Sequence, residues 1–441
     1  MRISVIGCGY LGAVHAAAMA EFGHEVVGVD VDQQKVDLLA AGEAPFYEPG
    51  LPELLQSAGA SGRLTFTTDI AQAAGARVHF VCVGTPQAPG EFRADLSFVD
   101  AAFAALAPHV APGDAVVGKS TVPVGTAERL AALLEPTGAT LVWNPEFLRE
   151  GFAVKDTMHP DRLVYGLPTD HAGVPTAAGD DARALLDDVY AAPLAEGSPL
   201  VVTDYATAQL VKVAANSFLA TKISFINAMA ELCEATGADV TRLADAIGYD
   251  DRIGRKFLNA GLGFGGGCLP KDIRAFMARA GELGVDQALT FLREVDSINT
   301  RRRERMVDLA REVCGGTLVG KRIAVLGASF KPNSDDVRDS PALSVAAMLA
   351  RQGADVVVTD PQGLANARAR WPELGYATSA VDAARGADAV LLATEWAEYR
   401  ELEPDALAQV VGQRHILDGR NVLDPAKWRS AGWTYRALGR P

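Results

Sequence analysis

The chain has no long apolar run. None of its hydrophobic stretches approaches the roughly 18 residues that a membrane-spanning helix needs. Its first residues, MRISVIGCGY, have the pattern of a strand and not the charged and apolar regions of a signal peptide. We therefore expect a cytoplasmic protein with no membrane partner.

Cysteine is scarce. The five cysteines are odd in number and widely spaced, with no CxxC pair. This pattern argues against a disulfide framework and against a zinc site, so we expect no metal. The five are Cys8, Cys82, Cys233, Cys268 and Cys314.

Positive charge is in short supply, because 41 lysines and arginines face 55 aspartates and glutamates, giving a formal net charge of −14. Binding a nucleic acid requires clustered cations, so we expect no nucleic-acid partner. An anionic ligand would have to be bound by a few local cations. The composition, with 49% hydrophobic and 22% charged residues, is typical of a globular enzyme, and 441 residues are enough for two or three domains.

The N-terminal part alternates short apolar runs with alanine-rich helical stretches. This alternation is typical of a parallel sheet covered by helices on both faces, so we predict a doubly wound α/β domain. The predicted segments are a strand over residues 2–7, a turn at Gly7–Gly12, a helix over Val14–Phe22, and strands over Glu25–Asp30, Val78–Val83, Ala115–Lys119 and Leu141–Trp143.

Strand patterns disappear between Asp204 and Thr300, where helical periodicity takes over. After Lys321 the first pattern returns: KRIAVLGASF repeats MRISVIGCGY, and ADVVVTDP repeats HEVVGVDVD. We therefore predict an α/β fold of two Rossmann-like doubly wound domains joined by a long-helix central region. The predicted domains are residues 1–203, 204–300 and 301–441.

The turn GCGYLG has the GxGxxG spacing of a dinucleotide-binding turn. It follows a predicted strand and opens a helix, and Asp30 ends the next strand, where it could accept a hydrogen bond from an adenosine ribose. A carboxylate at that position would repel a 2′-phosphate, so we expect NAD as the cofactor. The residues assigned to it here are Gly7, Gly9, Tyr10, Leu11, Gly12 and Asp30.

Other polar residues near this turn have two interpretations. Lys35 fits a solvated helix as well as it fits a cofactor contact. Thr85, Ser120 and Thr121 lie just past predicted strand ends, where open α/β sheets bind ligands. Their hydroxyls are equally suited to turns and helix caps, so the sequence leaves their role open.

The segment GLGFGGGCLPKD, residues 261–272, is rich in glycine. Each glycine inside a helix or strand costs about 1 kcal/mol relative to alanine, so we expect another group to approach this backbone closely. Cys268 stands near Lys271 and Asp272. A thiol beside a lysine or a helix N-terminus can have its pKa lowered from about 8.5 toward neutrality and become a nucleophile. We predict this role for Cys268, and the ordinary role of a small buried hydrophobe for Cys8, Cys82 and Cys233; Cys314 has no evident chemistry.

Two further pairs of polar residues occur at helical spacing. Lys212 and Asn216 are four residues apart, so they share one face of a predicted helix. A ligand site and a solvated face are equally consistent with them. Glu146 and Glu150 in NPEFLREG lie one helical turn apart. They could activate water and bind a ligand, or they could favour a helix start.

Together these motifs resemble the UDP-glucose/GDP-mannose dehydrogenase family. The resemblance runs from Met1 to about residue 425 and is strongest in GCGYLG, CVGTP, KSTVPVGT, NPEFLREGFAVKDTMHPDRLVYG, KVAANSFLATKISFINAMAE, FLNAGLGFGGGCLPKD and SFKPNSDDVRDSP. It implies an N-terminal NAD-binding domain, a helical domain that forms a homodimer interface, and a C-terminal domain that binds the nucleotide of a sugar substrate.

The resemblance also implies roles for individual residues. Those implied to bind NAD are Asp30, Lys35, Thr85, Thr121, Glu150, Lys271 and Arg338. Those implied to bind the nucleotide sugar are Phe147, Leu148, Arg149, Glu150, Lys212, Asn216, Arg252, Phe257, Leu258, Asn259, Ala260, Gly261, Gly265, Lys331 and Arg420.

The implied reaction is the NAD-dependent four-electron oxidation of UDP-glucose at C6. Four electrons require two NAD, and a thiohemiacetal and then a thioester on Cys268 would hold the sugar between the two steps. Lys212 and Asn216 would stabilise the developing oxyanion. The residues expected to position or deprotonate water and relay protons are Asp272, Thr121 and Glu146.

The sequence leaves other functions open. A GDP-mannose or UDP-N-acetylmannosamine 6-dehydrogenase would share the chemistry. A hydroxyacid dehydrogenase would need no cysteine and would form one NADH per substrate. A non-catalytic sensor of nucleotide sugars would bind its ligand and form no NADH.

Overall fold

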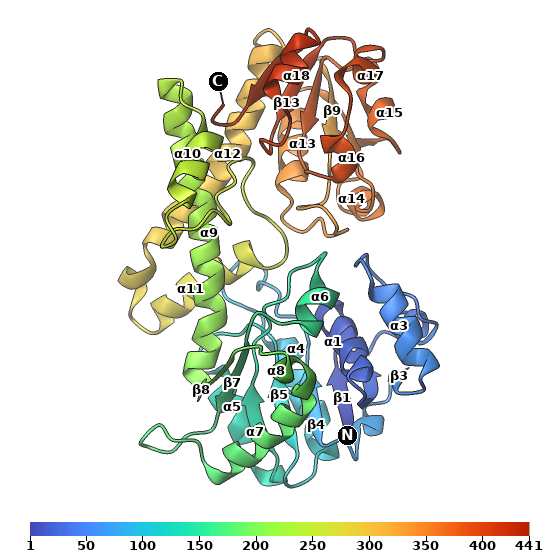
Figure 1. Ribbon diagram of the computed structural model, residues 1–441, viewed down its shortest axis with the longest axis vertical. Helices are drawn as coiled ribbons and strands as arrows, with labels where there is room; N and C mark the ends of the chain where they lie inside the picture. The colour runs from blue at the N-terminus through green and yellow to red at the C-terminus, as the bar shows by residue number, and fades with distance from the viewer. Residues whose placement is uncertain (441) are drawn as a thin grey trace. The chain divides into compact units, whose positions relative to one another are not determined.

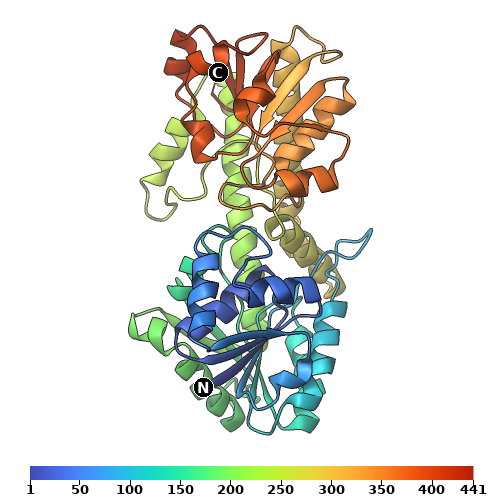
Figure 2. The same cartoon turned by 90° about the vertical axis from the view of Figure 1, so that its right-hand side faces the viewer.

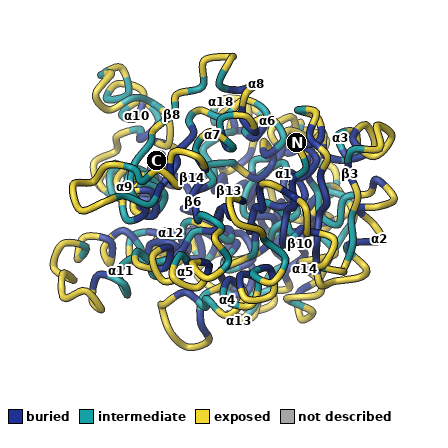
Figure 3. The backbone as a smooth tube through the Cα atoms, turned by 90° about the horizontal axis from the view of Figure 1, so that it is seen from below, coloured by how far each residue is buried: buried dark blue, intermediate teal, exposed yellow. Residues whose placement is uncertain are grey.

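The computed structural model describes residues 1–440, which divide into two compact units. The first unit contains Met1–Ala215 and Arg274–Gly284, and the second contains Asn216–Ile273 and the residues from Val285 onward. Buried backbone follows the strands of both units, whereas most outer turns are exposed (Figure 3).

The first unit is built on an eight-stranded sheet of order β3-β2-β1-β4-β5-β6-β7-β8 (Figure 1). All neighbouring strands are parallel except β6 and β7, whose antiparallel pairing the sequence did not predict. The strands are β1 Arg2–Ile6, β2 Glu25–Val29, β3 Leu64–Thr67, β4 Val78–Val81, β5 Ala115–Gly118, β6 Thr140–Trp143, β7 Leu163–Leu167 and β8 Leu200–Asp204.

Helices cover both faces of this sheet (Figure 2). Successive side chains of β1 point to opposite faces of the sheet, and both faces are buried. Ile3 and Val5 pack in one cluster with residues of α1, whereas Ile6 packs in another with residues of α4 and α5. The helices are α1 Tyr10–Glu21, α2 Gln33–Ala40, α3 Leu51–Ala60, α4 Ser97–Leu106, α5 Thr126–Leu134, α6 Ala153–Met158, α7 Ala177–Val189 and α8 Ala191–Ala195.

Helix α1 begins at Tyr10, four residues before the predicted start at Val14. The Gly9 carbonyl already accepts a hydrogen bond from the Ala13 amide at 2.9 Å, so the end of the glycine-rich turn is also the first turn of the helix. Every residue from Gly12 to Ala20 is buried, so the helix has no alternation of apolar and polar residues that would mark its start in the sequence.

The helical middle of the chain is confirmed. Helix α9 runs over Tyr205–Thr236, 32 residues, and contributes its first part to one unit and the remainder to the other. It is followed by α10 Val240–Gly248, α11 Leu269–Glu282 and α12 Phe291–Val313. Among the helices of residues 1–440, none combines the length and the hydropathy that a membrane span requires.

The second unit contains a six-stranded parallel sheet of order β11-β10-β9-β12-β13-β14, which confirms the second Rossmann-like repeat. In both sheets the order reverses once, between β1 and β4 and between β9 and β12. The strands are β9 Arg322–Leu326, β10 Asp355–Thr359, β11 Gly375–Tyr376, β12 Ala389–Leu392, β13 His415–Asp418 and β14 Thr434–Ala437. The helices beside them are α13 Pro341–Arg351, α14 Leu364–Arg370, α15 Ala380–Ala384, α16 Ala397–Arg400, α17 Pro404–Ala408 and α18 Pro425–Ser430.

Candidate active site

The glycine-rich turn lies at the carboxyl end of β1, where the order of the first sheet reverses. A Cβ atom on Gly7 would lie 2.7 Å from Val83, and one on Gly12 would lie 1.9 Å from the Gly7 carbonyl oxygen. A Cβ on Gly9 would meet no heavy atom of residues 1–440 within 4 Å. Protein packing therefore requires Gly7 and Gly12, whereas Gly9 leaves its backbone open to a ligand, as in a dinucleotide turn.

Asp30 follows β2 at the same edge and is buried. Its Oδ2 accepts a hydrogen bond from the Cys8 amide at 2.8 Å, and its Oδ1 accepts one from the Asp32 amide at 3.0 Å. A carboxylate has about four acceptor positions, so two of them suit the ribose hydroxyls of a dinucleotide. Lys35 Nζ lies 3.6 Å from Oδ1, which places this lysine at the same edge of the sheet as Asp30.

Thr85 and Thr121 lie in the segments that follow β4 and β5. The Thr85 hydroxyl donates to the Thr121 carbonyl at 2.8 Å, and the Ser120 hydroxyl donates to the Val83 carbonyl at 2.6 Å. The Thr85 and Ser120 hydroxyls therefore tie neighbouring turns together at the sheet edge, as ordinary turn hydroxyls do.

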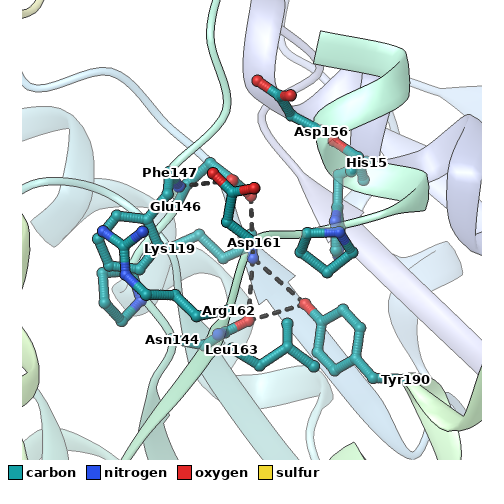
Figure 4. Close-up of a pocket in the computed structure, with 13 residues that line it drawn as sticks. His15, Lys119, Asn144, Glu146, Phe147, Asp156, Asp161, Arg162, Leu163 and Tyr190 are labelled. Carbon is teal, nitrogen blue, oxygen red and sulfur yellow. Dashed lines mark hydrogen bonds and ion pairs between the residues drawn. The ribbon is translucent and has the colours of Figure 1, made fainter. Parts of the chain in front are cut away.

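A small pocket of about 30 Å³ lies beside Glu146 in the first unit (Figure 4). His15, Lys119 and Tyr190 line it, and none of these was a candidate from the sequence. A usable signal was present, because Lys119 directly follows β5 and Asn144, another lining residue, directly follows the neighbouring β6. Side chains at the carboxyl ends of adjacent parallel strands meet at one edge.

The segment Phe147–Glu150 follows Glu146. Lys212 Nζ lies 5.4 Å from the centre of the Phe147 ring, so the structure brings two predicted substrate residues together. The Arg149 side chain is exposed and binds Asp156 through Nε at 2.8 Å and Nη2 at 2.6 Å. Glu150 is buried.

Cys268 immediately precedes helix α11 and lies in the second unit. Its carbonyl accepts a hydrogen bond from the Asp272 amide at 2.9 Å, which makes Cys268 the N-cap residue. The Asp272 carboxylate is buried; it accepts from Asn216 Nδ2 at 2.7 Å and lies 2.5 Å from Lys271 Nζ. Four predicted residues, Cys268, Lys271, Asp272 and Asn216, thus gather at one helix N-terminus.

Cys268 is exposed, whereas the other four cysteines are buried. Burial raises the pKa of the Cys8, Cys233 and Cys314 thiols, and raises that of Cys82 to about 12. These four therefore remain thiols near neutral pH and are poor nucleophiles. Only Cys268 among the five is open to an approaching substrate.

The close approach expected at the glycine-rich segment is made by the protein itself. The Gly266 amide donates to the Arg338 carbonyl at 2.9 Å, and the Leu262 amide donates to the Gly419 carbonyl at 2.9 Å. A Cβ on Gly267 would lie 2.4 Å from Arg338 Cζ, and one on Gly265 would lie 2.3 Å from the Asp339 carbonyl oxygen. The segment is therefore held against the loops of the second sheet immediately before Cys268.

Arg420 was expected to bind the substrate, but its guanidinium already has protein partners. Nε donates to the Ala393 carbonyl at 2.7 Å and lies 3.3 Å from Glu395, and Nη1 donates to the Gly263 carbonyl at 3.0 Å. It links the ends of β12 and β13 to the glycine-rich segment. Lys331, which lies in the loop after β9, has its Nζ 5.4 Å from the Phe330 ring centre.

Asp360 follows β10, the position that Asp30 has in the first sheet. It accepts hydrogen bonds from the Ala328, Ser329, Gln362 and Gly363 amides, the Ser329 hydroxyl and the Trp396 indole. These donors use the capacity of the carboxylate, so it cannot bind a ribose as Asp30 could. Of the two sheets, only the first has an acidic residue in this position with acceptor capacity left for a ribose.

The segment Phe257–Gly261 forms another loop of the second unit. Phe257 has a φ of 65°, Leu258 and Ala260 are buried, and the Gly261 amide donates to Asn227 Oδ1 at 2.9 Å. Asn259 is exposed and accepts from Arg255 Nη1 at 2.8 Å. Arg252 is also exposed and pairs with Asp250 at 2.6 Å.

Models of three domains of one family match consecutive parts of the chain: the NAD binding domain over residues 1–191, the central domain over 206–301 and the UDP binding domain over 324–425. The chain belongs to the UDP-glucose/GDP-mannose dehydrogenase family. It is an NAD-dependent oxidoreductase with a domain for a UDP-linked substrate.

The chain is 42% identical to UDP-glucose 6-dehydrogenase of Rhizobium meliloti, over all of both chains. Among solved structures it is similar to UDP-glucose dehydrogenase of Pyrobaculum islandicum, with 38% identity, a TM-score of 0.88 and 98% of each chain covered. It is also similar to UDP-D-ManNAc dehydrogenase of Pyrococcus horikoshii, with 27% identity, a TM-score of 0.86, and 100% and 99% of the two chains covered.

Proposed function

We propose that this member of the family oxidises UDP-glucose at C6 to UDP-glucuronate, with two NAD consumed per sugar. The observation that carries the proposal is the exposed Cys268 at the N-terminus of α11, beside a buried Asp272 that Asn216 and Lys271 hold in place. A hydroxyacid dehydrogenase needs no nucleophilic thiol in its reaction, and a non-catalytic sensor does not require an exposed one.

We assign to Cys268 the role of holding the sugar between the two oxidations. When bound, NAD accepts the hydride in each of the two oxidations. The Cys268 sulfur adds to the C6 aldehyde formed first, and the aldehyde oxygen takes up a proton to give a thiohemiacetal. Loss of a hydride and a proton gives the thioester, and water cleaves the carbon–sulfur bond to yield the carboxylate and regenerate the thiol.

Other residues of this chain would bind and orient the sugar and water. Lys212 and Asn216 lie one turn apart on α9, and we assign both to the oxyanion at C6. Asp272, Thr121 and Glu146 are assigned to holding water and moving its proton. The cofactor is assigned to Gly7–Gly12, Asp30, Lys35, Thr85, Thr121, Glu150, Lys271 and Arg338.

The nucleotide sugar is assigned to the segments Phe147–Glu150 and Phe257–Gly261, with Gly265, Arg252 and Lys331. Lys331 supplies a cation that suits the diphosphate. Arg420 already donates to the Ala393 and Gly263 carbonyls, so we assign it an indirect role: it holds the glycine-rich segment in place beside the substrate. We assign UDP-glucose as the substrate because a relative at 42% identity and a solved structure at 38% identity are UDP-glucose dehydrogenases by name.

We also propose a homodimer built on α9. Phe218, Phe225 and Leu232 are exposed and seven residues apart, so they form one apolar stripe along the helix. Such a stripe is typical of a helix that packs against a second copy. We assign NAD binding to a domain of residues 1–203, dimer formation to residues 204–300 and UDP binding to residues 301–441. We also propose that the protein is cytoplasmic.

NADH formation with purified enzyme tests the function. With UDP-glucose we expect two NADH per sugar and UDP-glucuronate as product, and no NADH with Cys268→Ser beyond the first oxidation. Cys314→Ala serves as the control because Cys314 is buried and distant in sequence. One NADH per sugar, wild-type uronate formation by Cys268→Ser, or turnover of only GDP-mannose or UDP-N-acetylmannosamine would contradict the proposal.

A further inference from the structure

Lys119 is a buried lysine whose position follows from strand register. It comes directly after β5, and Asn144 comes directly after β6; the two strands are parallel, with Gly118 opposite Trp143. The two side chains therefore leave the sheet side by side. Lys119 is only 3% exposed, so its ammonium group has little access to water.

Three groups surround the ammonium (Figure 4). Lys119 Nζ donates to Asn144 Oδ1 at 2.9 Å and to the Tyr190 hydroxyl oxygen at 3.2 Å, and it lies 3.3 Å from Glu146 Oε2. Asn144 cannot turn easily, because its Nδ2 donates to the Val164 carbonyl at 2.9 Å. The Tyr190 hydroxyl donates to Asn144 Oδ1 at 2.7 Å, which leaves its own oxygen to accept from Lys119.

Burying an ammonium group is costly unless it is paired, and an apolar side chain would fill the same space without that cost. The amide, the phenol and the rings of Phe80 and Tyr190, whose centres lie 5.7 and 5.8 Å away, are all neutral. Glu146 supplies the negative charge. The network thus holds a positive charge at one carboxylate oxygen.

The other oxygen of Glu146 is held as well. Oε1 accepts hydrogen bonds from the Phe147 amide at 2.6 Å and the Leu148 amide at 2.8 Å. These amides begin the segment Phe147–Glu150, which is assigned to the sugar. The orientation of the Glu146 carboxylate and the shape of that segment therefore depend on one another.

We propose that Lys119 is a positioning residue that acts on the reaction only through Glu146. Its ammonium fixes the carboxylate while Asn144 and Tyr190 fix the ammonium, and Lys119 itself touches neither sugar nor cofactor. The inference rests on the proposed function, in which Glu146 moves a proton. Small displacements of a catalytic group can lower turnover by about 100-fold, so the loss of Lys119 should affect kcat more than the sugar KM.

The test is a double-mutant cycle of Lys119→Met and Glu146→Gln, with kcat and KM measured for UDP-glucose. We expect each single variant to lower kcat by about 10- to 100-fold, and the double variant to be no slower than the slower single one. Lys155→Met, on the exposed side of α6, is the matched control and should keep wild-type kcat. Thermal unfolding of each variant shows whether the fold is retained.

If Lys119→Met does not fold, Lys119→Arg takes its place. Arginine keeps the positive charge but moves it away from the position that the Lys119 ammonium occupies. Its effect on kcat should disappear in the Glu146→Gln background. Multiplicative effects in either cycle, or full kcat in a folded Lys119→Met, would overturn the inference. Full kcat in Glu146→Gln would instead remove Glu146 from the proposed mechanism.

Discussion

The hydroxyl of Tyr10 donates to the carboxylate of Glu48, and this bond joins the start of α1 to a loop residue 38 positions later in the chain. Tyr10 is the first residue of α1 in the glycine-rich turn, and its ring lies 4.6 Å from that of Phe46. Glu48 is 2% exposed and also accepts from the Gly151 amide at 2.6 Å and the Ala153 amide at 2.7 Å. One buried carboxylate thus links the cofactor turn to the segment that follows Glu150.

Replacing Glu48 with glutamine should loosen this junction. The amide group of glutamine would face amides and a hydroxyl that now donate to a carboxylate, and each such charged hydrogen bond contributes about 1.5–3 kcal/mol. We expect a lower melting temperature and a higher KM for both NAD and the nucleotide sugar, measured by calorimetry and initial rates. Tyr165→Phe is the control, since its buried hydroxyl bonds only at 3.4 Å to the Leu186 carbonyl. Unchanged KM values for both ligands in Glu48→Gln would refute the link.

Substitution of Gly9 should weaken NAD binding, whereas substitution of Gly12 should lower the stability of the fold. Gly9→Ala adds a Cβ in open space, so the melting temperature should stay near the wild-type value while NAD binding, measured by calorimetry, weakens by about tenfold or more. Gly12→Ala places a Cβ 1.9 Å from a carbonyl oxygen and should unfold the protein at lower temperature even without ligand. Equal losses of stability in the two variants would contradict this division.

A charge placed in the apolar stripe on α9 should break the proposed homodimer. Phe225→Glu puts a charge into an apolar contact between two copies, so the variant should elute as a monomer in size-exclusion chromatography with light scattering, where the wild type elutes as a dimer. Val319→Glu is the control, because Val319 is an exposed apolar residue outside the stripe. A wild-type protein that is monomeric at micromolar concentration would rule out the dimer.

His15 should make the protein less stable in mild acid. Burial lowers its pKa well below the ordinary value, and the charge of Lys119 lowers it further. Below about pH 6.5 the unfolded chain protonates this histidine and the native state does not, so stability falls as pH falls and is unaffected above that value. This one group makes the free energy of unfolding fall by up to about 1.4 kcal/mol for each pH unit below that value.

His15→Phe should remove that part of the slope. Urea titrations at pH 7.5, 6.5 and 5.5 would then show a smaller loss of unfolding free energy in acid than the wild type shows. The loss does not vanish, because burial also lowers the pKa of His24 and His79. His171→Phe, in an exposed loop, is the control. Identical slopes for His15→Phe and the wild type would contradict the prediction.

Local patterns in the sequence determined the repeated α/β units, the long helix α9 and the glycine-rich turn, because strand alternation, helical period and glycine spacing depend only on neighbouring residues. They also predicted Cys268 as a nucleophile from the cation and carboxylate beside it, and that role stays a prediction. They did not predict the antiparallel pairing of β6 and β7, because the residues of one strand do not determine the direction of the strand that pairs with it.

Only the tertiary structure decided which polar groups meet. Lys119 reaches Glu146 because β5 and β6 are paired in one register, Glu48 accepts from Tyr10 at the start of α1, and the Arg420 guanidinium donates to backbone carbonyls. Each of these contacts joins residues far apart in the chain. Buried donors and acceptors must find partners wherever the fold brings them, so such contacts follow from packing and cannot be predicted from spacing.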